Sequence, residues 1–226
     1  MEAVSPSPSP DAQAAPRPNY VYWGGPNLYV NLTSRCSASC TFCLRTFTWE
    51  VFGYDLRLAP DQEPSAVQVI EAAQAALGER RPREVVFTGL GEPTLRLLEL
   101  TEVLRWANAR GLPTRLDTNG HGQLLNPGHH VAWELADAGL DAVSISLNAP
   151  DAEAYEAICR PVVAKAFAAV VEFIRDVVAL GLEVTVTAVD VPGLDLPAVM
   201  ELATELGAGL RVRRLITPAD RSRTSS

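Results

Sequence analysis

The chain has 226 residues, 47% of them hydrophobic, and a formal net charge of −8 at pH 7. This length and apolar content suit a single globular domain with a sizeable core. The acidic balance argues against a general nucleic-acid binder, which normally presents a basic face. No apolar run approaches the roughly 18 residues of a membrane-spanning helix, so we expect no membrane association. Three of the four cysteines are clustered and do not suggest a disulfide framework, which favours a cytoplasmic location.

The two ends of the chain have the composition of disordered segments. Residues 1–18 consist mainly of Ser, Pro and Ala and lack the apolar core of a secretory signal. Residues 218–226 also offer nothing to bury. We therefore expect a disordered leader over 1–18, a folded domain over 19–217 and a disordered tail over 218–226.

Between these ends, short apolar runs alternate with helical patterns, which indicates βα units and a parallel sheet. Strands are predicted at residues 28–32, 84–88, 114–118, 142–147, 183–189 and 210–215. Helices are predicted at about 66–77, 97–109, 131–138 and 196–206, with a further helical region from 151 to 180 that Pro161 interrupts. Ser65 and Gln68 have the spacing of a capping box for the first helix.

Six such repeats are too few to close an eight-stranded barrel, which typically needs about 250 residues. The predicted fold class is therefore α/β, with an open, partial (β/α)6 TIM-like barrel. In such folds the chemistry lies at the carboxyl ends of the strands, and every polar motif described below follows a predicted strand.

Cys36, Cys40 and Cys43 form the strongest motif, with the spacing C-x3-C-x2-C directly after the first predicted strand. Thiolates this close together usually share a metal, and soft sulfur ligands select iron–sulfur clusters, zinc or copper(I). No histidine lies nearby to complete a tetrahedral zinc site. Three thiolates on a [4Fe–4S] cluster would leave one iron open to a small molecule. The alternatives are three buried thiols or a zinc site with a remote ligand.

Two further motifs end the second and third predicted strands. In the turn 89–93, Gly89 and Gly91 let the backbone approach a ligand, and Glu92 can accept hydrogen bonds from an ammonium group. In the turn 117–120, Asp, Thr and Asn oxygens suit a cation or the polar end of a ligand. Taken alone, each motif is more often an ordinary turn.

The remaining signals are weaker. Ser144, Ser146 and Asn148 share one strand face by their spacing of two, and would suit a carboxylate or ribose hydroxyls, although a solvated edge strand is the alternative. Cys159 and Arg160 are candidate catalytic residues, although an isolated cysteine is more often a small buried side chain. Positive charge comes from Arg45, Arg211, Arg213 and Arg214. Arg211 and Arg213 share a strand face and could hold an anionic substrate group, although plain surface charge is the alternative and is the interpretation that we favour for Arg214. We interpret His121, His129 and His130 as solvated loop residues.

The cysteine motif, with the aromatic Phe42 before its last cysteine, resembles the signature of the radical S-adenosylmethionine (SAM) superfamily. The turn 89–93 is similar to the GGEP-type motif of that superfamily, with Leu90 in place of the second glycine. The similarity covers nearly all of residues 27–215. Within it, the stretches 29–36, 40–45, 143–149 and 159–161 resemble the TatD-associated radical SAM proteins, named for occurring alongside TatD-type metal-dependent hydrolases.

The resemblance implies that Cys36, Cys40 and Cys43 ligate a [4Fe–4S] cluster and that SAM chelates the open iron through its amino and carboxylate groups. It also implies contacts from Gly89, Gly91 and Glu92 to the amino group of SAM. The other expected cofactor-binding residues are Phe42, Asp117, Thr118, Asn119, Ser144, Ser146 and Asn148.

The implied reaction is reductive cleavage of SAM to methionine and a 5′-deoxyadenosyl radical, which abstracts a hydrogen atom from a substrate. The cofactors carry the difficult chemistry, and the protein orients and shields them. The expected partners are a one-electron reductant of the flavodoxin or ferredoxin type, a large substrate such as a peptide or protein, and a TatD-family hydrolase. Two other classes stay open: an iron–sulfur electron carrier that uses Cys159 as a fourth ligand, and a zinc-stabilised partner-binding module.

Overall fold

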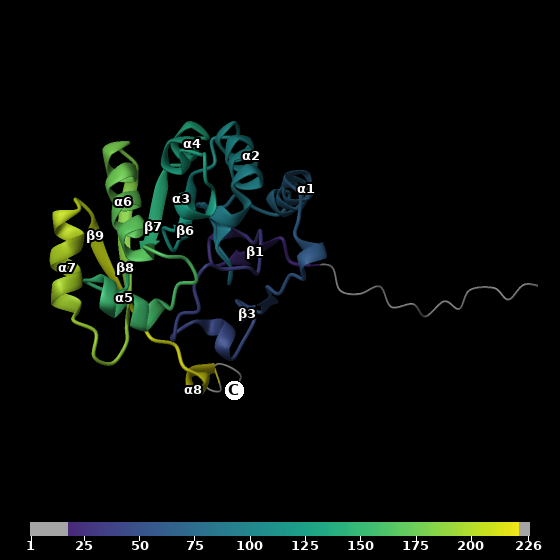
Figure 1. Cartoon of the computed structure of the whole chain (residues 1–226). Helices are drawn as coiled ribbons and strands as arrows, with labels where there is room; N and C mark the ends of the chain where they lie inside the picture. Colours follow the sequence, from purple (N-terminus) through teal and green to yellow (C-terminus); the bar gives the residue numbers. More distant parts are fainter. Residues whose placement is uncertain (1–17, 222–226) are drawn as a thin grey trace, which may run out of the picture.

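The computed structural model describes residues 18–221, which form a curved seven-stranded sheet with helices around its outer face (Figure 1). The sheet contains β1 (Val21–Gly24), β2 (Asn27–Val30), β5 (Val85–Phe87), β6 (Thr114–Thr118), β7 (Ala142–Ser146), β8 (Glu183–Asp190) and β9 (Gly209–Arg214). These strands lie side by side in that order. β1 is antiparallel to β2, and every other neighbouring pair is parallel.

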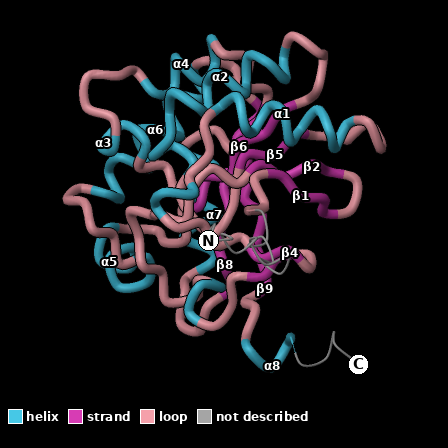
Figure 2. Tube along the Cα trace, turned by 90° about the vertical axis from the view of Figure 1, so that its right-hand side faces the viewer, coloured by secondary structure: helices cyan, strands magenta, loops and turns pink. Residues whose placement is uncertain are grey.

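The helices follow the parallel strands in turn and pack against one another around the outside of the sheet (Figure 2). They are α1 (Ala66–Leu77), α2 (Leu97–Asn108), α3 (Gly122–Leu125), α4 (Val131–Asp137), α5 (Ala152–Cys159), α6 (Ala166–Ala179), α7 (Leu196–Glu205) and α8 (Pro218–Arg221). The predicted capping box is present at α1, where the Ser65 hydroxyl accepts from the Gln68 amide and the Gln68 side chain accepts from the Ser65 amide. Among the described residues, no helix is long and apolar enough to cross a lipid bilayer.

All six predicted strands are present, and the predicted α/β fold of the partial-barrel type is confirmed. The sequence did not reveal β1, which joins β2 through a turn in which Gly25 has φ +57°. Such a turn between two apolar stretches is a hairpin signal that was available in the sequence. The stretch between the cysteines and Glu63, for which we predicted no strand, contains the small hairpin of β3 (Glu50–Val51) and β4 (Tyr54–Asp55).

The two faces of the sheet differ in polarity. On β6, Leu116 and its neighbours at spacing two are buried beneath the helices, whereas Arg115 and Asp117 on the other face are only half-buried. Strands of parallel sheets are usually apolar on both faces, because helices cover both. Here helices cover one face, so the polar face lines the interior of the open barrel.

The predicted disordered ends have different outcomes. The leader lies almost wholly outside the described residues. The predicted tail was wrong for its first four residues, because Pro218–Arg221 forms the short helix α8. Asp220 in that helix accepts from the backbone and hydroxyl of Thr217 and pairs with Arg214 at 2.9 Å. These local hydrogen bonds stabilise a turn of helix without apolar burial. The prediction of disorder considered apolar burial alone and therefore missed this turn.

The turn after β5 packs against the segment that follows β2. The backbone N–H of Glu92 donates to the Arg35 carbonyl at 2.8 Å. A Cβ atom at Gly91 would overlap the carbonyl oxygens of Thr33 and Arg35, so only glycine allows the two backbones to lie this close. This contact sets the position of the Glu92 carboxylate relative to the cysteines.

We predict that Gly91→Ala destabilises the fold by about 2 kcal/mol or more, because the added methyl group forces two backbone segments apart. Chemical denaturation of the purified protein measures this loss. The matched control is Gly209→Ala, since a Cβ atom there meets no heavy atom within 4 Å. Equal stability of the two variants would contradict the close backbone contact.

Candidate active site

The cysteine loop, residues 36–43, is held by backbone hydrogen bonds to the carboxyl end of α5. The Thr41 N–H donates to the Ile158 carbonyl at 2.9 Å, and the Ser39 N–H donates to the Cys159 carbonyl at 3.1 Å. The last carbonyl groups of a helix have no partner inside the helix and must find one elsewhere. The cysteine loop supplies those donors, so the position of α5 determines the position of the loop.

Two arginines complete the attachment of this loop. Arg160 ends α5 in the left-handed conformation, with φ +46°, and its carbonyl also accepts from the backbone at 3.1 Å. Arg45 donates to the carbonyl oxygens of Ser34 and Ala38 at 3.0 and 3.1 Å. The guanidinium of Arg45 therefore links the backbone before the loop to the backbone at its start.

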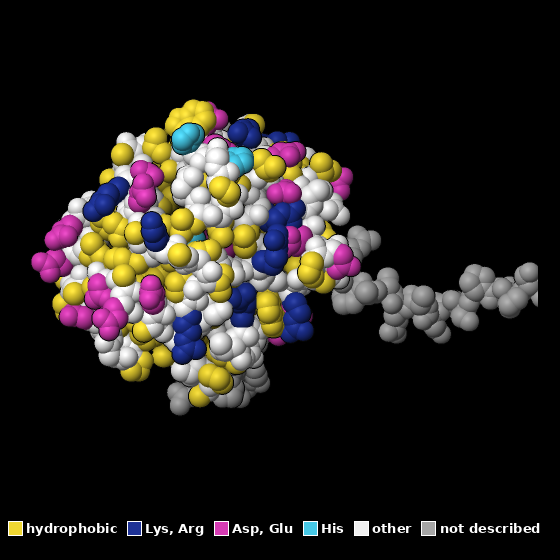
Figure 3. All heavy atoms as spheres, viewed as in Figure 1, with side chains coloured by type: hydrophobic (Ala, Val, Ile, Leu, Met, Phe, Trp, Pro, Cys, Tyr) yellow, Lys and Arg dark blue, Asp and Glu magenta, His cyan; other side chains and the backbone are white. Residues whose placement is uncertain are grey.

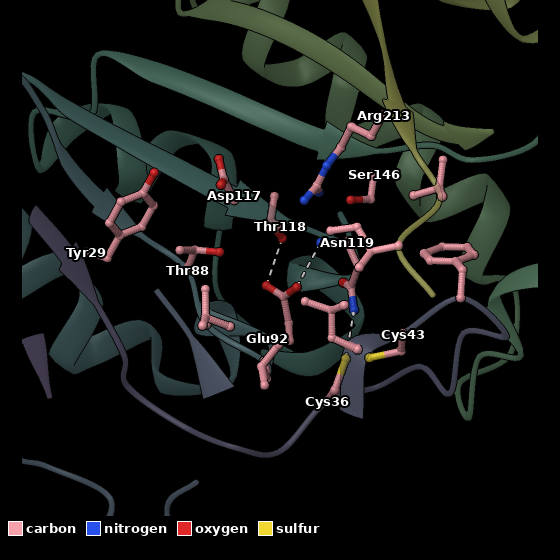
Figure 4. Close-up of a pocket in the computed structure, with 18 of the residues that line it drawn as sticks. Tyr29, Cys36, Cys43, Thr88, Glu92, Asp117, Thr118, Asn119, Ser146 and Arg213 are labelled. Atoms are coloured by element: carbon pink, nitrogen blue, oxygen red, sulfur yellow. Dashed lines mark hydrogen bonds between the residues drawn. The ribbon is translucent and has the colours of Figure 1, made fainter. Parts of the chain in front are cut away.

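The three clustered thiols do not all face the same way. Figure 4 shows Cys36 and Cys43 beside each other at one end of a cavity. Cys40 does not line this cavity, and its thiol lies beside the buried thiol of Cys159. Burial raises the pKa of the Cys36 thiol to about 11, and the Asn119 amide donates to its sulfur at 3.7 Å.

In the described part of the chain, no group of three or more Cys, His, Asp or Glu side chains converges as a site for an ion. The donor set nevertheless fits an iron–sulfur cluster, because two thiols already line the cavity and the third belongs to the same short loop. Binding as thiolates would displace the protons that burial retains at Cys36. Cys36, Cys40 and Cys43 are thus the residues that would hold the cluster.

A series of hydrogen-bonded polar side chains contacts the cysteine loop at Ser37. The Ser37 hydroxyl lies 2.9 Å from Nδ1 of His121, and Nε2 of that ring lies 2.8 Å from the Tyr155 hydroxyl. Asn119 donates to the same serine at 3.0 Å. The prediction of a solvated His121 was wrong, because its side chain is completely buried. The other two histidines do lie at the surface, as predicted.

Glu92 is a buried carboxylate surrounded by hydrogen-bond donors. One oxygen accepts from the Thr94 hydroxyl and the Thr118 hydroxyl, both at 2.7 Å, and the other accepts from the Asn119 N–H at 2.8 Å (Figure 4). Burial raises the pKa of this carboxyl group, and the donors oppose that rise. The carboxylate is fixed between the turn after β5 and the end of β6, close to Cys36.

The cavity has a volume of about 490 Å³ and lies inside the open barrel, at the carboxyl ends of its strands. Most of the predicted site residues line it, namely Cys36, Phe42, Cys43, Gly89, Gly91, Glu92, Asp117, Thr118, Asn119 and Ser146. Cys40, Ser144, Asn148, Cys159 and Arg160 do not line it. The catalytic role of Cys159 and Arg160 stays a prediction, and both have a structural part in the attachment of the cysteine loop.

Two polar residues of β7 and its end differ from the expected arrangement. Ser144 is buried, and its hydroxyl accepts from Arg211 at 3.2 Å. Asn148 was predicted on the same face as the two serines, but the chain turns at φ +58° there and the side chain leaves the cavity. Its amide donates to the Cys159 sulfur at 3.6 Å, and its oxygen accepts from the Val189 N–H. The strand period could not locate it, because the strand ends at Ser146.

The end of the cavity away from the cysteines contains features that the sequence did not indicate. Tyr22 and Tyr29 stack with ring centroids 5.3 Å apart, and Phe52 lies against Tyr29 at 5.5 Å. Arg115 pairs with Asp117 and lies 3.3 Å from Glu84. Burial raises the pKa of Asp117, and the neighbouring arginines oppose that rise. Asp117 is therefore engaged by a protein cation and is not a free acceptor.

We predict that His121 makes the stability of the protein depend on pH. Burial lowers its pKa to about 4, so between about pH 6.5 and 4 the unfolded chain binds a proton that the folded chain does not. The free energy of unfolding therefore falls as the pH falls through this window, by at most about 1.4 kcal/mol per pH unit. Denaturant titrations of wild type and His121→Gln at pH 7.5 and 5.5 measure the difference, and His129→Gln is the control. An unchanged slope in His121→Gln would contradict the prediction.

Comparison with known proteins places this geometry in a wider context. GTP 3′,8-cyclase of Corynebacterium glutamicum (strain R) is 32% identical over 194 residues, which cover 82% of this chain and 48% of that protein. The chain thus spans about half the length of this relative. Two solved structures share the fold. Streptococcus suis SuiB bound to SAM has a TM-score of 0.65 at 15% identity and covers 85% of this chain and 41% of its own. TYW1 with a lysine–pyruvate adduct has a TM-score of 0.61 at 15% identity and covers 85% and 66%.

A profile of the radical SAM superfamily matches residues 30–206, from the end of β2 to the end of α7. The match includes the cysteine loop, the buried Glu92 and the ends of β6 and β7, which together line the cavity. The cofactors of this superfamily are a [4Fe–4S] cluster and SAM. The chain belongs to the radical SAM superfamily.

Proposed function

We propose that this protein binds SAM in the barrel cavity, beside a [4Fe–4S] cluster held by Cys36, Cys40 and Cys43, and uses it to remove a hydrogen atom from a substrate. The observation that carries this proposal is the arrangement of Cys36, Glu92 and Asn119 at one end of the cavity. Thiol ligands, a fixed carboxylate and an amide lie next to one another there. When bound, the cluster supplies the electron that cleaves SAM to methionine and a 5′-deoxyadenosyl radical.

The residues of the chain itself bind and orient the cofactor. Glu92 accepts a hydrogen bond from the ammonium group of SAM, because a carboxylate already fixed by several donors needs no rearrangement to accept another. The turn at Gly89 and Gly91 lets the backbone approach that group. Ser146 lines the cavity at the end of β7, where it can hydrogen-bond a ribose or carboxylate oxygen.

Further assignments rest on sequence resemblance and on the openness of the barrel. We place the chain with the TatD-associated radical SAM proteins, and the contact between the stretches 36–45 and 159–161 supports treating their motifs as one unit.

β1 and β9 end the sheet without pairing to each other, which leaves a side open to a large substrate. A flavodoxin- or ferredoxin-type protein would supply the electron. The relatives are named as GTP cyclases, and SuiB is described with a precursor peptide, so they point to two different substrate classes.

An iron–sulfur electron carrier is the second candidate function, because the contact between Cys159 and Cys40 offers a fourth thiol. Cys159→Ala separates the two. A three-cysteine site keeps its full iron and sulfide content in this variant, whereas a four-cysteine cluster loses much of it. Retention of both contents is the expected result, since three thiolates and SAM complete the coordination.

We predict that Cys40→Ala abolishes SAM cleavage. Protein reconstituted without oxygen and reduced with dithionite should form 5′-deoxyadenosine from SAM, and the variant should form it at least 100-fold more slowly because a cluster ligand is lost. Chromatographic quantification of 5′-deoxyadenosine measures this. Equal product from wild type and variant would show that the cluster takes no part in the reaction. No product from a fully loaded wild type would favour the function of an iron–sulfur electron carrier.

We also predict that Glu92→Gln weakens SAM binding at least tenfold. The substitution removes the negative charge beside the ammonium group. It also replaces one of the two carboxylate oxygens by an NH2 group, so that either Thr118 or Asn119 loses the acceptor of its hydrogen bond. Calorimetric titration of SAM into the unreduced, cluster-loaded protein measures the affinity. Glu99→Gln is the matched control, because Glu99 pairs with Arg96 outside the cavity. The same loss in both variants would show that Glu92 has no specific role.

A further inference from the structure

The cavity is positively charged although the chain is acidic. Its lining includes four arginines, Arg115, Arg211, Arg213 and Arg214, and only two carboxylates, Glu92 and Asp117. The whole chain carries a net charge of −8. Acidic side chains gather instead on the outside, for example over α7 at the left edge of Figure 3. The three arginines of β9 are exposed, and a cavity lined by charges of one sign attracts ligands of the other sign, so this lining is a feature to be explained.

The protein's own carboxylates do not neutralise these arginines equally. Arg115 is paired with Asp117 and Glu84, and Arg214 is paired with Asp220 at 2.9 Å. Arg211 donates only to the neutral Ser144 hydroxyl. Arg213 makes no hydrogen bond or ion pair with any residue from 18 to 221. Its charge acts on Asp117, where it opposes the rise in pKa that burial causes. Two guanidinium groups are thus available to a ligand.

The register of the sheet places both available arginines on the face that lines the cavity. Arg211 lies opposite Thr187, and Arg213 lies opposite Val189, so both share a face of β9 by the spacing of two. Figure 4 shows the guanidinium of Arg213 pointing from β9 into the cavity, on the side of Ser146. The neighbouring Arg211 lies one step deeper along the strand, level with Thr187.

We propose that Arg211 and Arg213 form a subsite for a phosphate group of the substrate. This inference rests on the proposed function, since the substrate must lie in the same cavity as SAM. A guanidinium presents a rigid fork of donors that fits phosphate oxygens in pairs. Two such forks, with Arg115 and Arg214 nearby, match a group with more than one negative charge better than a single carboxylate. The subsite would fix the substrate on the β9 side, where hydrogen abstraction depends on its orientation.

The test uses cluster-loaded, unreduced protein saturated with SAM, and inorganic pyrophosphate as the probe. We expect calorimetry to detect pyrophosphate binding that weakens as the salt concentration rises. Arg211→Met and Arg213→Met should each weaken it at least tenfold, whereas Arg105→Met, which removes a surface charge on α2, should change it less than twofold. Thermal unfolding of each variant checks that the fold is retained, and Arg213→Lys should recover part of the affinity.

Several results would overturn the proposal. Pyrophosphate that fails to bind the wild type, or that binds Arg211→Met and Arg213→Met as tightly as the wild type, would exclude the subsite. Tighter binding of succinate than of pyrophosphate would overturn the phosphate assignment. A loss of SAM affinity as large as the loss of pyrophosphate affinity would assign the arginines to SAM. The formation of 5′-deoxyadenosine by the wild type is measured separately, so that its absence together with pyrophosphate binding counts only against the proposed function.

Discussion

The backbone hydrogen bonds between the cysteine loop and the end of α5 are the constraint on which the site depends. A short loop of thiol and hydroxyl residues has little apolar surface, so packing alone cannot fix it. The carbonyl groups at the end of α5 need donors that the helix lacks. The N–H groups of Ser39 and Thr41 satisfy them, which joins the segment after β2 to the helix after β7. The cluster ligands are therefore placed by a part of the chain more than a hundred residues away.

The second constraint is the unequal covering of the sheet. Helices bury the outer face, and the inner face carries Arg115 and Asp117 on β6, Ser146 on β7 and Arg213 on β9. A sheet with polar residues on one face is stable only if that face meets solvent, a ligand or paired charges. The open barrel provides solvent and paired charges, because its interior is a cavity with an ion pair at the end away from the thiols (Figure 4).

The sequence allowed six strands and most helices to be predicted, because these follow from apolar periodicity. Motif spacing also identified the cysteine loop, two of whose thiols line the cavity. The sequence could not reveal contacts between residues far apart in the chain. His121 in a loop has no local sign of burial, and only the approach of Ser37 and Tyr155 makes it a core residue. The same holds for Cys159, whose thiol touches Cys40 only because α5 docks on the loop. Asn148 was misplaced because the strand period was extended past the last residue of β7.

Glu92 connects these constraints. Its backbone N–H binds the Arg35 carbonyl just before the cysteine loop, and its carboxylate accepts from Thr118 and Asn119 at the end of β6. Burial of a carboxylate is unfavourable, and an apolar side chain would avoid that cost but leave the Asn119 N–H without an acceptor. A neutral amide would satisfy that donor and still lack the charge. A charged, fully fixed acceptor next to Cys36 is explained if a cation comes to lie beside it, and the ammonium group of SAM is such a cation.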